Sequence, residues 1–416
     1  LSKRSPCRPL WLQVTTIMPP LTDFARAAGL LLLAIQGWLL FVLLVRLAPG
    51  HSRRPPVAPR RSPRGDTTVS VIVTTLNEVH RVGPCLEGLM QQQEPLLEVL
   101  VVDSRSTDGT RELVQAAAAR DARIRLVTDD PLPPGGVGKV WALENGLREA
   151  KGDWVLGIDA DTVPAPGLVG AVIDADEQDG YDVASFSPQF RDQTPTERFV
   201  QPAMLTTLVY RCGAAGATQP PPDRVLANGQ CFVARRDLLL RHGGYAPARA
   251  SWCDDVTLAR HLAHHGARVG FLDGSKIIQV RSYASLSEMW REWGRSFDLK
   301  DATPMRRRWL DVALVWAVQA MPLPLLLAMG VAMAMGARNL AASPDAMLWR
   351  ALLLVNGLAL CIRLFMLWAL RGSYAERGWS FWLSWLSDIA AAWRLTLSTA
   401  RRPKAWRGRA FESLPA

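Results

Sequence analysis

Cysteine is scarce in this chain, and its spacing excludes the usual cysteine-based metal sites and disulfide frameworks. The 416 residues include six cysteines, at positions 7, 85, 212, 231, 253 and 361, and no two of them form a Cys-x-x-Cys pair. Structural zinc sites and small disulfide scaffolds both need closely spaced cysteines. We therefore expect reduced thiols in a cytosol-like compartment.

Negative charge is also in short supply. Lysine and arginine total 48 against 38 aspartates and glutamates, which gives a formal net charge of +10. A basic excess suits nucleic acid, anionic lipid or a phosphorylated substrate. The chain has no recognisable nucleic-acid docking motif, and its arginine clusters flank apolar runs, so we expect a membrane as partner and no nucleic acid.

The first long apolar run covers residues 27–48, where Gln36 is the only strongly polar side chain before Arg46. It is long enough to cross a bilayer as a transmembrane helix. A signal peptide is the alternative, but the run is longer than a typical signal core and no small-x-small cleavage site comes after it. Residues 1–26 form an N-terminal extension, in which Met18 offers an alternative start.

Residues 49–67 are basic and rich in proline. This composition predicts a stiff, extended linker. The positive-inside rule places this linker in the cytoplasm, together with the domain that begins at residue 68.

Between residues 68 and 305 short β-branched runs alternate with helical stretches. Strands are expected at 69–75, 97–103, 123–128, 153–162 and 182–187, and helices at 81–93, 110–120, 137–150 and 197–210. The alternation predicts an α/β domain with right-handed βαβ units and a mostly parallel sheet. We expect the helix at 197–210 to be amphipathic and to lie on the membrane surface.

Two carboxylates one residue apart end the fourth of these strands. Alternation along an extended backbone would put Asp159 and Asp161 on one side, where they repel each other and call for a positive partner. A hard divalent cation carrying a diphosphate fits best, because Mg²⁺ and Mn²⁺ prefer carboxylate and phosphate oxygens. A solvated turn after the strand is the alternative. In parallel sheets ligands lie at the carboxyl ends of strands, so Glu78, Asp103 and this pair are expected to share one crevice.

Four motifs in this region resemble, in order and spacing, those of family 2 glycosyltransferases with the Rossmann-like GT-A fold. They are Asn77-Glu78, Val102-Asp103-Ser104-Arg105-Ser106-Thr107-Asp108-Gly109-Thr110, Gly138-Lys139-Val140-Trp141-Ala142-Leu143-Glu144-Asn145-Gly146 and Asp159-Ala160-Asp161. Each motif alone is weak, but their succession over residues 69–162 is specific. The resemblance implies a GT-A domain that binds a nucleotide sugar (UDP- or GDP-linked) with Mg²⁺ or Mn²⁺.

The resemblance also implies roles for single residues. Asp103, with Glu78 or the backbone near Thr75, would receive the base and ribose, and Lys139 would offer a positive charge to the diphosphate. A solvated Lys139 is the alternative, although a cation in a first helical turn opposes the helix dipole. The donor-binding set is Thr75, Asn77, Glu78, Asp103, Ser104, Lys139, Asp159, Gly229, Arg291 and Arg295, the metal ligands are Asp161 and Asp159, and Asp108 is expected to cap a turn or helix instead.

A second acidic pair begins a helix near residue 254. Trp252-Cys253-Asp254-Asp255 resembles the family motif in which the second acid is the catalytic base. We predict that Asp255 is that base and that Asp254 raises its pKa by like charge. Two acids that favour a helix N-terminus are the alternative.

The same predicted helix carries His261, His264 and His265. The spacing of His261 and His265 could suit zinc, but no glutamate stands between them in the required place and the sequence offers no obvious third ligand. We interpret these residues as ordinary exposed or packing histidines.

Trp290 to Phe297 resembles only loosely the Gln-x-x-Arg-Trp segment of processive cellulose and hyaluronan synthases, because Arg291 and Arg295 are four residues apart and Trp293 precedes Arg295. The two arginines share a helix face and could hold a diphosphate. A solvated basic face, or contact with anionic lipid head groups, is the alternative.

The C-terminal part of the chain contains three apolar stretches. Residues 309–337 and 347–371 are predicted to cross the membrane, 379–400 to form an interfacial or transmembrane helix, and 401–416 a basic cytosolic tail. A third crossing would place that tail outside, against the positive-inside rule, so an interfacial or re-entrant helix is favoured.

The whole layout resembles hopanoid-associated and ceramide glucosyltransferases, and residues 294–302 resemble a segment of cyanobacterial carotenoid (myxol) 2′-O-glycosyltransferases. This implies a multi-pass membrane enzyme whose cytoplasmic domain transfers a hexose or deoxyhexose, with inversion, to a hydroxyl of a lipid or carotenoid acceptor. One alternative is an exopolysaccharide or lipid-linked sugar synthase. Another is a non-catalytic membrane scaffold that binds nucleotide sugar.

Overall fold

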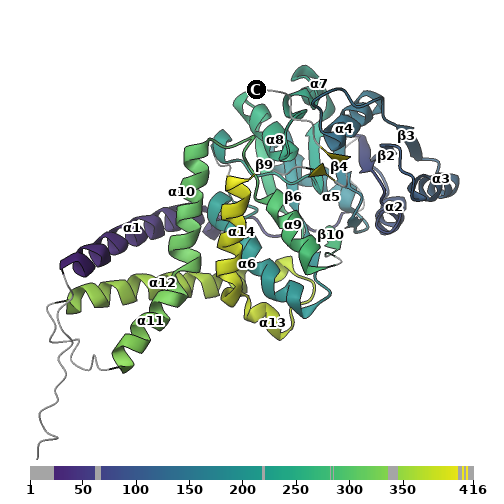
Figure 1. Cartoon of the computed structure of the whole chain (residues 1–416). Helices are drawn as coiled ribbons and strands as arrows, with labels where there is room; N and C mark the ends of the chain where they lie inside the picture. Colours follow the sequence, from purple (N-terminus) through teal and green to yellow (C-terminus); the bar gives the residue numbers. More distant parts are fainter. Residues whose placement is uncertain are drawn as a thin grey trace, which may run out of the picture.

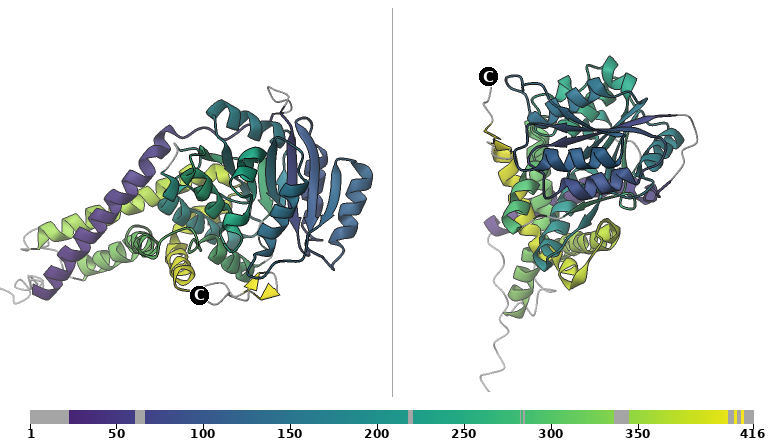
Figure 2. Two further views of the ribbon diagram at one scale, coloured as in Figure 1. Left: turned by 90° about the horizontal axis from the view of Figure 1, so that it is seen from above. Right: turned by 90° about the vertical axis from the view of Figure 1, so that its right-hand side faces the viewer.

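The computed structural model describes residues 23–60, 67–217, 221–281, 283, 285–335, 345–401, 405–406 and 409–410. It shows an α/β domain from which a group of helices extends to one side (Figures 1 and 2). The predicted N-terminal extension and basic tail lie largely outside the described residues.

The α/β domain is built on a seven-stranded sheet in the order β3-β2-β1-β4-β8-β6-β9. β8 is antiparallel to β4 and β6, and the other pairings in this sheet are parallel, which confirms the α/β class and the mostly parallel sheet. Its strands are β1 (Val69–Thr75), β2 (Leu96–Asp103), β3 (Ile124–Thr128), β4 (Trp154–Asp159), β6 (Val183–Ser187), β8 (Cys231–Arg235) and β9 (Val269–Asp273). Two small sheets are formed by β5 (Thr162–Pro164), β10 (Ile278–Arg281) and β7 (Gln189–Arg191), and by β11 (Ala405–Trp406) and β12 (Arg409–Ala410).

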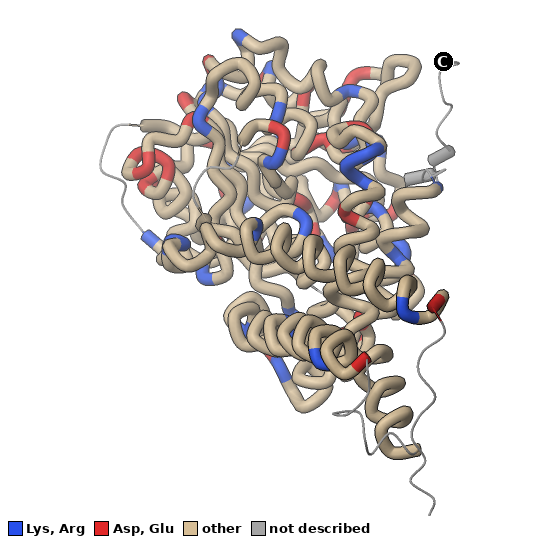
Figure 3. The backbone as a smooth tube through the Cα atoms, turned by 90° about the vertical axis from the view of Figure 1, so that its left-hand side faces the viewer, with Lys and Arg blue, Asp and Glu red and all other residues tan. Residues whose placement is uncertain are grey.

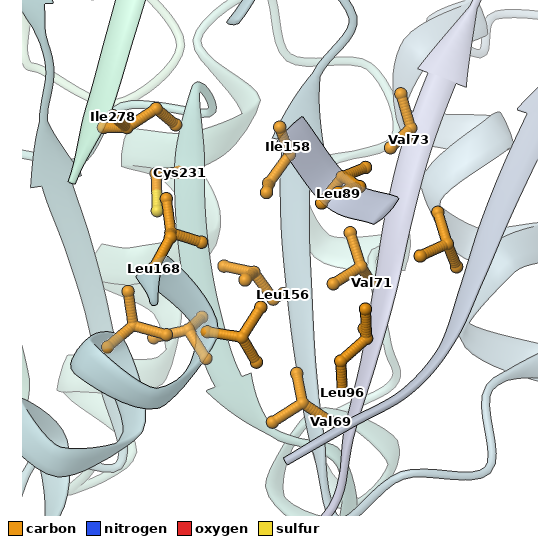
Figure 4. Packing of buried hydrophobic residues seen from close by; sticks show 14 of the residues in the cluster. Val69, Val71, Val73, Leu89, Leu96, Leu156, Ile158, Leu168, Cys231 and Ile278 are labelled. Atoms are coloured by element: carbon orange, nitrogen blue, oxygen red, sulfur yellow. The ribbon is translucent and has the colours of Figure 1, made fainter. Parts of the chain in front are cut away.

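Helices cover both faces of the large sheet, which explains why its strands are apolar almost throughout. Along β1, Val69, Val71 and Val73 enter one core, shown in Figure 4, whereas Ile72 enters the core on the opposite face. Burying one such side chain contributes roughly 1.5–3 kcal/mol. The helices of this domain are α2 (Val82–Met90), α3 (Thr110–Arg120), α4 (Gly138–Glu149), α5 (Leu168–Asp179), α7 (Arg236–Arg241), α8 (Asp254–His264) and α9 (Leu286–Ser296), with 3-10 turns η3 (Pro222–Arg224) and η4 (Ala246–Ala248).

The helical extension combines the N-terminal helix, one helix from the middle of the chain and the helices that follow residue 304. Its elements are α1 (Asp23–Leu47), η2 (Ala48–Ser52), α6 (Pro195–Cys212), α10 (Met305–Val315), the π-helical η5 (Trp316–Ala320), α11 (Pro322–Ala334), α12 (Ala346–Leu370), η7 (Arg371–Ser373), α13 (Gly378–Trp382), η8 (Ser384–Ser387) and α14 (Asp388–Ala400). Among the described residues, α1 with η2 and α12 with η7 are long and apolar enough to cross a membrane.

The stretch predicted at 309–337 is not one straight helix. The helices Met305–Ala320 and Pro322–Ala334 meet at an angle of 44°. Pro322 and Pro324 lack the N–H groups that would continue the preceding helix, which accounts for the break. The pair provides a third crossing only if both halves are taken as one span. The stretch predicted at 379–400 is likewise broken, into α13, η8 and α14.

Polar side chains inside the extension pair with one another. Gln36 of α1 and Asn356 of α12 exchange two hydrogen bonds, of 3.0 and 3.1 Å. Arg363 of α12 forms an ion pair of 2.8 Å with Asp388, which also accepts a hydrogen bond from Gln319. A polar group that leaves water needs such a partner.

The expectation of a surface helix at 197–210 is wrong. α6 is buried along most of its length and packs against α1, α13 and α14. Its polar residues are satisfied inside the protein: Thr206 donates to the carbonyl of Pro202, and Thr207 lies 3.1 Å from Gln319. Because these polar side chains are hydrogen-bonded inside the protein, the sequence of this buried helix resembles that of a half-exposed one.

Candidate active site

The carboxyl ends of three neighbouring strands bring the predicted polar residues to one edge of the sheet. Thr75 at the end of β1 lies opposite Asp103 at the end of β2, and Thr74 lies opposite Asp159 at the end of β4. This is the convergence expected for a parallel sheet.

Asp159 and Asp161 come together through a turn and not through strand alternation. β4 ends at Asp159, Ala160 and Asp161 form a turn, and β5 begins at Thr162, whose hydroxyl donates to the carbonyl of Asp159. The argument from an extended backbone was therefore wrong in its geometry. Both residues nevertheless line the same cavity, and the charge of Asp159 raises the pKa of Asp161.

Positive charge faces this acidic pair, as expected. Lys139 Nζ, from the first turn of α4, lies 2.7 Å from Asp159 Oδ1. Burial lowers the pKa of Lys139, but the carboxylates of Asp159, Asp254 and Asp255 more than offset this, and the net pKa shift is upward. Lys139 therefore carries a positive charge that interacts with both acidic pairs. This differs from the alternative, in which its side chain was solvated.

Asp161 has the properties of a ligand for a hard cation. Burial and the charge of Asp159 raise its pKa to about 6, against the opposing effects of Arg81 and Lys139. Its Oδ1 atom is buried and has no hydrogen-bond donor among the described residues. A buried carboxylate oxygen without a donor is costly unless a cation binds it, so the residues present fit Mg²⁺ or Mn²⁺.

Asp254 and Asp255 begin α8 and turn into the same site. Burial, and then the charge of Asp254, raise the pKa of Asp255 to about 7, although Lys139 opposes the shift. Burial also raises the pKa of Asp254. Gly229, just before β8, allows close contact here: a Cβ atom on it would lie 2.7 Å from Lys139 Nζ and 3.8 Å from Asp255 Oδ2.

The loop after β2 is held by its own hydrogen bonds. The Asp103 carboxylate is fully buried and accepts hydrogen bonds from the Thr75 hydroxyl, the Ser106 hydroxyl and N–H, and the Arg111 guanidinium. It thus lies beneath the surface of the site. Asp108 accepts from Thr110 N–H and Val79 N–H, which confirms its predicted role in a turn.

The arginines of α9 reach the opposite wall. Arg295 forms an ion pair of 2.7 Å with Glu292, and Arg291 lies 3.6 Å from the same carboxylate. Behind them Arg394 of α14 crosses α9 at Gly294, where an added Cβ would lie 1.3 Å from the guanidinium. The Arg394 Nε–H donates to the carbonyl of Trp290 at 2.6 Å.

These groups line one cavity of about 1620 Å³. It brings together all predicted catalytic, metal and donor-binding residues except Asp103. Residues of the cavity that the sequence did not single out include Arg81, Tyr283 and Arg394. Arg81 lies shortly after the Asn-Glu motif and could have been suspected, whereas Tyr283 and Arg394 are brought in by tertiary packing alone.

The comparison with protein families is decisive for this part of the chain. Residues 70–243 match the model described as "Glycosyl transferase family 2". The chain carries a glycosyl transferase family 2 domain. The matched segment runs from β1 to the turn after α7, so this family 2 domain contains Lys139, Asp159, Asp161 and Gly229, while Asp254 and Asp255 come after it.

Curated relatives agree with this assignment. The chain is 25% identical over 232 residues to the probable glycosyltransferase YdaM of Bacillus subtilis, a match that covers 55% of this chain and 53% of that protein. It is 28% identical over 203 residues to the ceramide glucosyltransferase of Pyricularia oryzae, covering 44% and 41%. A third match, to the succinoglycan biosynthesis protein ExoO of Rhizobium meliloti, is 31% identical and covers 28% and 32%. The chain thus spans about half or less of the length of these relatives.

Among solved structures, the chain is similar to the mannosyltransferase PcManGT of Pyrobaculum calidifontis in complex with GDP-Man and Mn²⁺. The identity is 20%, the match covers 89% of this chain and 99% of that chain, and the TM-score is 0.47. A likeness of this size carries no conclusion about function.

Proposed function

We propose that the protein transfers a sugar, with inversion, from a UDP- or GDP-sugar to a hydroxyl group of a lipid-soluble acceptor. The observation that carries this proposal is the shared cavity, because its lining runs from Lys139, Asp161 and Asp255 to Leu370 of α12 and Leu397 of α14. A polar donor and an apolar acceptor could therefore meet at Asp255.

The chemistry rests on the residues around the donor. Asp255 takes the proton of the attacking hydroxyl, and a pKa of about 7 suits a base that works near neutral pH. Lys139 and the α9 arginines hold the negative diphosphate as it departs. When bound at Asp161 and Asp159, the divalent cation supplies charge neutralisation of the leaving diphosphate. A base on the acceptor side, opposite the leaving group, gives inversion at the sugar carbon.

Apolar surface supports a membrane location. Large side chains on the outside of α1 and α12 are exposed, among them Leu31, Trp38, Leu354 and Phe365. Figure 3 shows few charged residues along this extension compared with the α/β domain. Soluble proteins rarely expose apolar patches of this extent. We infer a multi-pass membrane protein whose catalytic domain faces the cytoplasm, on the side of the basic linker.

The acceptor class rests on the same cavity and on one relative. The cavity walls include apolar side chains of α6 and α14 besides Trp290 and Trp293. One relative is a ceramide glucosyltransferase. We propose a carotenoid, hopanoid or sphingolipid-like acceptor that enters from the membrane side.

A second candidate function is synthesis of an exopolysaccharide or a lipid-linked sugar. It is favoured by the similarity to a succinoglycan biosynthesis protein. A non-catalytic scaffold that only binds nucleotide sugar has less support, because Lys139, Asp161 and Asp255 all line the cavity.

The test is sugar transfer by membranes that contain the protein. Radiolabelled UDP- and GDP-sugars are supplied with lipid and pigment extract and Mg²⁺ or Mn²⁺, beside Asp255→Asn. Asp237→Asn is the matched control, because its carboxylate is exposed on α7 and pairs only with Arg241 among the described residues. Label in one discrete lipid band, lost only in Asp255→Asn, is the expected result. Label in polymer would favour the second candidate, and donor binding without transfer to any acceptor would favour the scaffold.

A further inference from the structure

Three histidine side chains at the ends of two helices meet outside the cavity. Atoms of His242, His261 and His265 that can bind a metal all lie within 4.8 Å of one another. The ring centroids of His261 and His265 are 4.3 Å apart, and those of His242 and His265 are 5.0 Å apart. We propose that these three residues form a site for a transition-metal ion of the Zn²⁺ class, independent of the carboxylate site.

The local backbone explains how the third ligand arrives. His261 and His265 are four residues apart at the end of α8 and so share one face. His242 comes directly after α7, and the turn after it has positive φ at Gly243 (82°) and Gly244 (61°). Glycine is suited to such a turn, which ends α7 beside the last turn of α8.

The His265 ring is oriented by a backbone contact, because its Nδ1 atom lies 2.7 Å from the carbonyl oxygen of His261. Metal-binding histidines commonly use one ring nitrogen in this way, which fixes the ring and leaves the other nitrogen for the ion. His264 differs, because its Nε2 atom lies 3.0 Å from Asp223 Oδ1.

Little movement is needed to close the site. Zn²⁺ binds histidine nitrogen at about 2.0–2.1 Å, so tetrahedral ligand atoms stand about 3.4 Å apart. Each pair of atoms then has to approach by at most about 1.4 Å, which side-chain rotation can supply because His265 is exposed and the other two are half-buried. The fourth position would face solvent.

The two proposed ion sites differ in chemistry. Imidazole nitrogen suits Zn²⁺, Cu²⁺ and Ni²⁺, whereas carboxylate oxygen suits Mg²⁺ and Mn²⁺. They also stand at opposite ends of one helix, since α8 begins with Asp254 and Asp255 and the histidines lie at its end. Six to ten residues of helix separate Asp255 from the two α8 histidines, or roughly 9–15 Å. In Figure 1, α7 and α8 lie at the end of the molecule opposite α11. An ion here would brace α7 against the helix that presents Asp255.

The experiment measures metal binding to the full-length protein purified in detergent. Zn²⁺ is titrated against a chelating dye at about pH 7.5, where imidazole side chains are mostly neutral. Excess Mg²⁺ is present throughout to occupy oxygen sites. The variants are His265→Gln and His242→Gln, and His264→Gln is the matched control on the same helix. Co²⁺ serves as a second probe, because its visible absorption distinguishes tetrahedral nitrogen ligands from octahedral oxygen ligands.

We expect one Zn²⁺ per chain, and an affinity reduced by more than about 100-fold in His265→Gln and His242→Gln, since losing even an outer-shell partner reduces affinity about 10- to 100-fold. His264→Gln should bind as the unchanged protein does. Zn²⁺ should also raise the thermal midpoint of the unchanged protein and of His264→Gln but not that of His265→Gln, while all three melt alike in EDTA.

Two results would overturn the proposal. One is the absence of Zn²⁺ binding, or binding too weak to survive competition from the dye. The other is binding that His265→Gln and His242→Gln retain, which would assign the ion to another place. Neither result depends on sugar transfer, so this experiment tests the metal site independently of the proposed activity.

Discussion

Replacing Asp255 by asparagine tests the assignment of the base and the electrostatics of the site together. Asparagine keeps the shape of the side chain and removes its ability to accept a proton. General-base catalysis contributes roughly 10²- to 10⁴-fold, so kcat/KM should fall by that factor while the nucleotide sugar still binds. The assay is the initial rate of label transfer to the acceptor, with donor affinity measured in parallel.

The pH dependence of kcat/KM tests whether Asp255 acts in its deprotonated form. Burial and the charge of Asp254 raise the pKa of Asp255 to about 7. The base acts when deprotonated, so kcat/KM should rise with pH, reach half of its plateau near pH 7, and stay constant above. Asp254→Asn removes the like charge and lowers the pKa of Asp255. The rising part of the profile, its acid limb, should therefore move to lower pH by on the order of one unit.

A control separates Asp255 from Asp161, whose pKa is also raised, to about 6. Protonation of a metal ligand competes with the cation, so a limb due to Asp161 moves to lower pH as the Mg²⁺ concentration rises. A limb due to Asp255 does not move. The reasoning is refuted if Asp255→Asn keeps its rate, or if Asp254→Asn leaves the limb in place or shifts it upward.

Three further predictions concern the cation, the donor and the helix packing. Because burial and Asp159 raise the pKa of Asp161 to about 6, Mn²⁺ should raise the thermal midpoint more at about pH 7.5 than at about pH 5, and Asp161→Asn should lose most of this gain. Gly229→Ala should displace the Lys139 ammonium and lower kcat/KM about tenfold with the fold intact, as kinetics and circular dichroism would show. Gly294→Ala should lower the stability by about 1–3 kcal/mol through its clash with the Arg394 guanidinium, as thermal unfolding would show.

Matched variants control the two glycine predictions. Gly83→Ala and Gly330→Ala add a methyl group in α2 and α11 where nothing lies within 4 Å, so neither should lower activity or stability. Adding Arg394→Ala to Gly294→Ala removes the clashing group and should restore most of the lost stability. A Gly229→Ala enzyme with normal donor kinetics, or a double variant as unstable as Gly294→Ala alone, would contradict the respective argument.

The strands of the large sheet were predictable because the residue pattern that specifies each strand lies within the strand itself and its neighbouring segments. Strand β1 was placed at its observed bounds, and β2 and β3 to within one residue, since β-branched runs between helical stretches have few other interpretations. The strand ends then predicted that Glu78 and Asp159 share one crevice. Asp255 was assigned as the base from the family resemblance alone. The turn at Asp161 was not predicted. Whether a strand continues for two more residues or ends in a turn depends on a single residue at its end, which the sequence pattern does not resolve.

The other errors and omissions have a non-local origin. The burial of α6 depends on partners from α1, α13 and α14, and its internal hydrogen bonds give the sequence of a half-exposed helix. His242 lies 19 residues before His261 along the chain. No spacing rule joins them, because the contact is made by the turn that ends α7. Arg394 enters the site only because Gly294 lets α14 cross α9 closely.

The hydrogen-bonded pair of Gln36 and Asn356 has a consequence for biogenesis. The two amides are separated by 320 residues, so a ribosome delivers α1 long before α12 exists. If α1 enters the bilayer first, as a membrane location requires, its glutamine waits without its final partner while the whole catalytic domain is synthesised, at an energetic cost in hydrocarbon. In that case the first helix would be a provisional anchor, with its final position set only when α12 arrives.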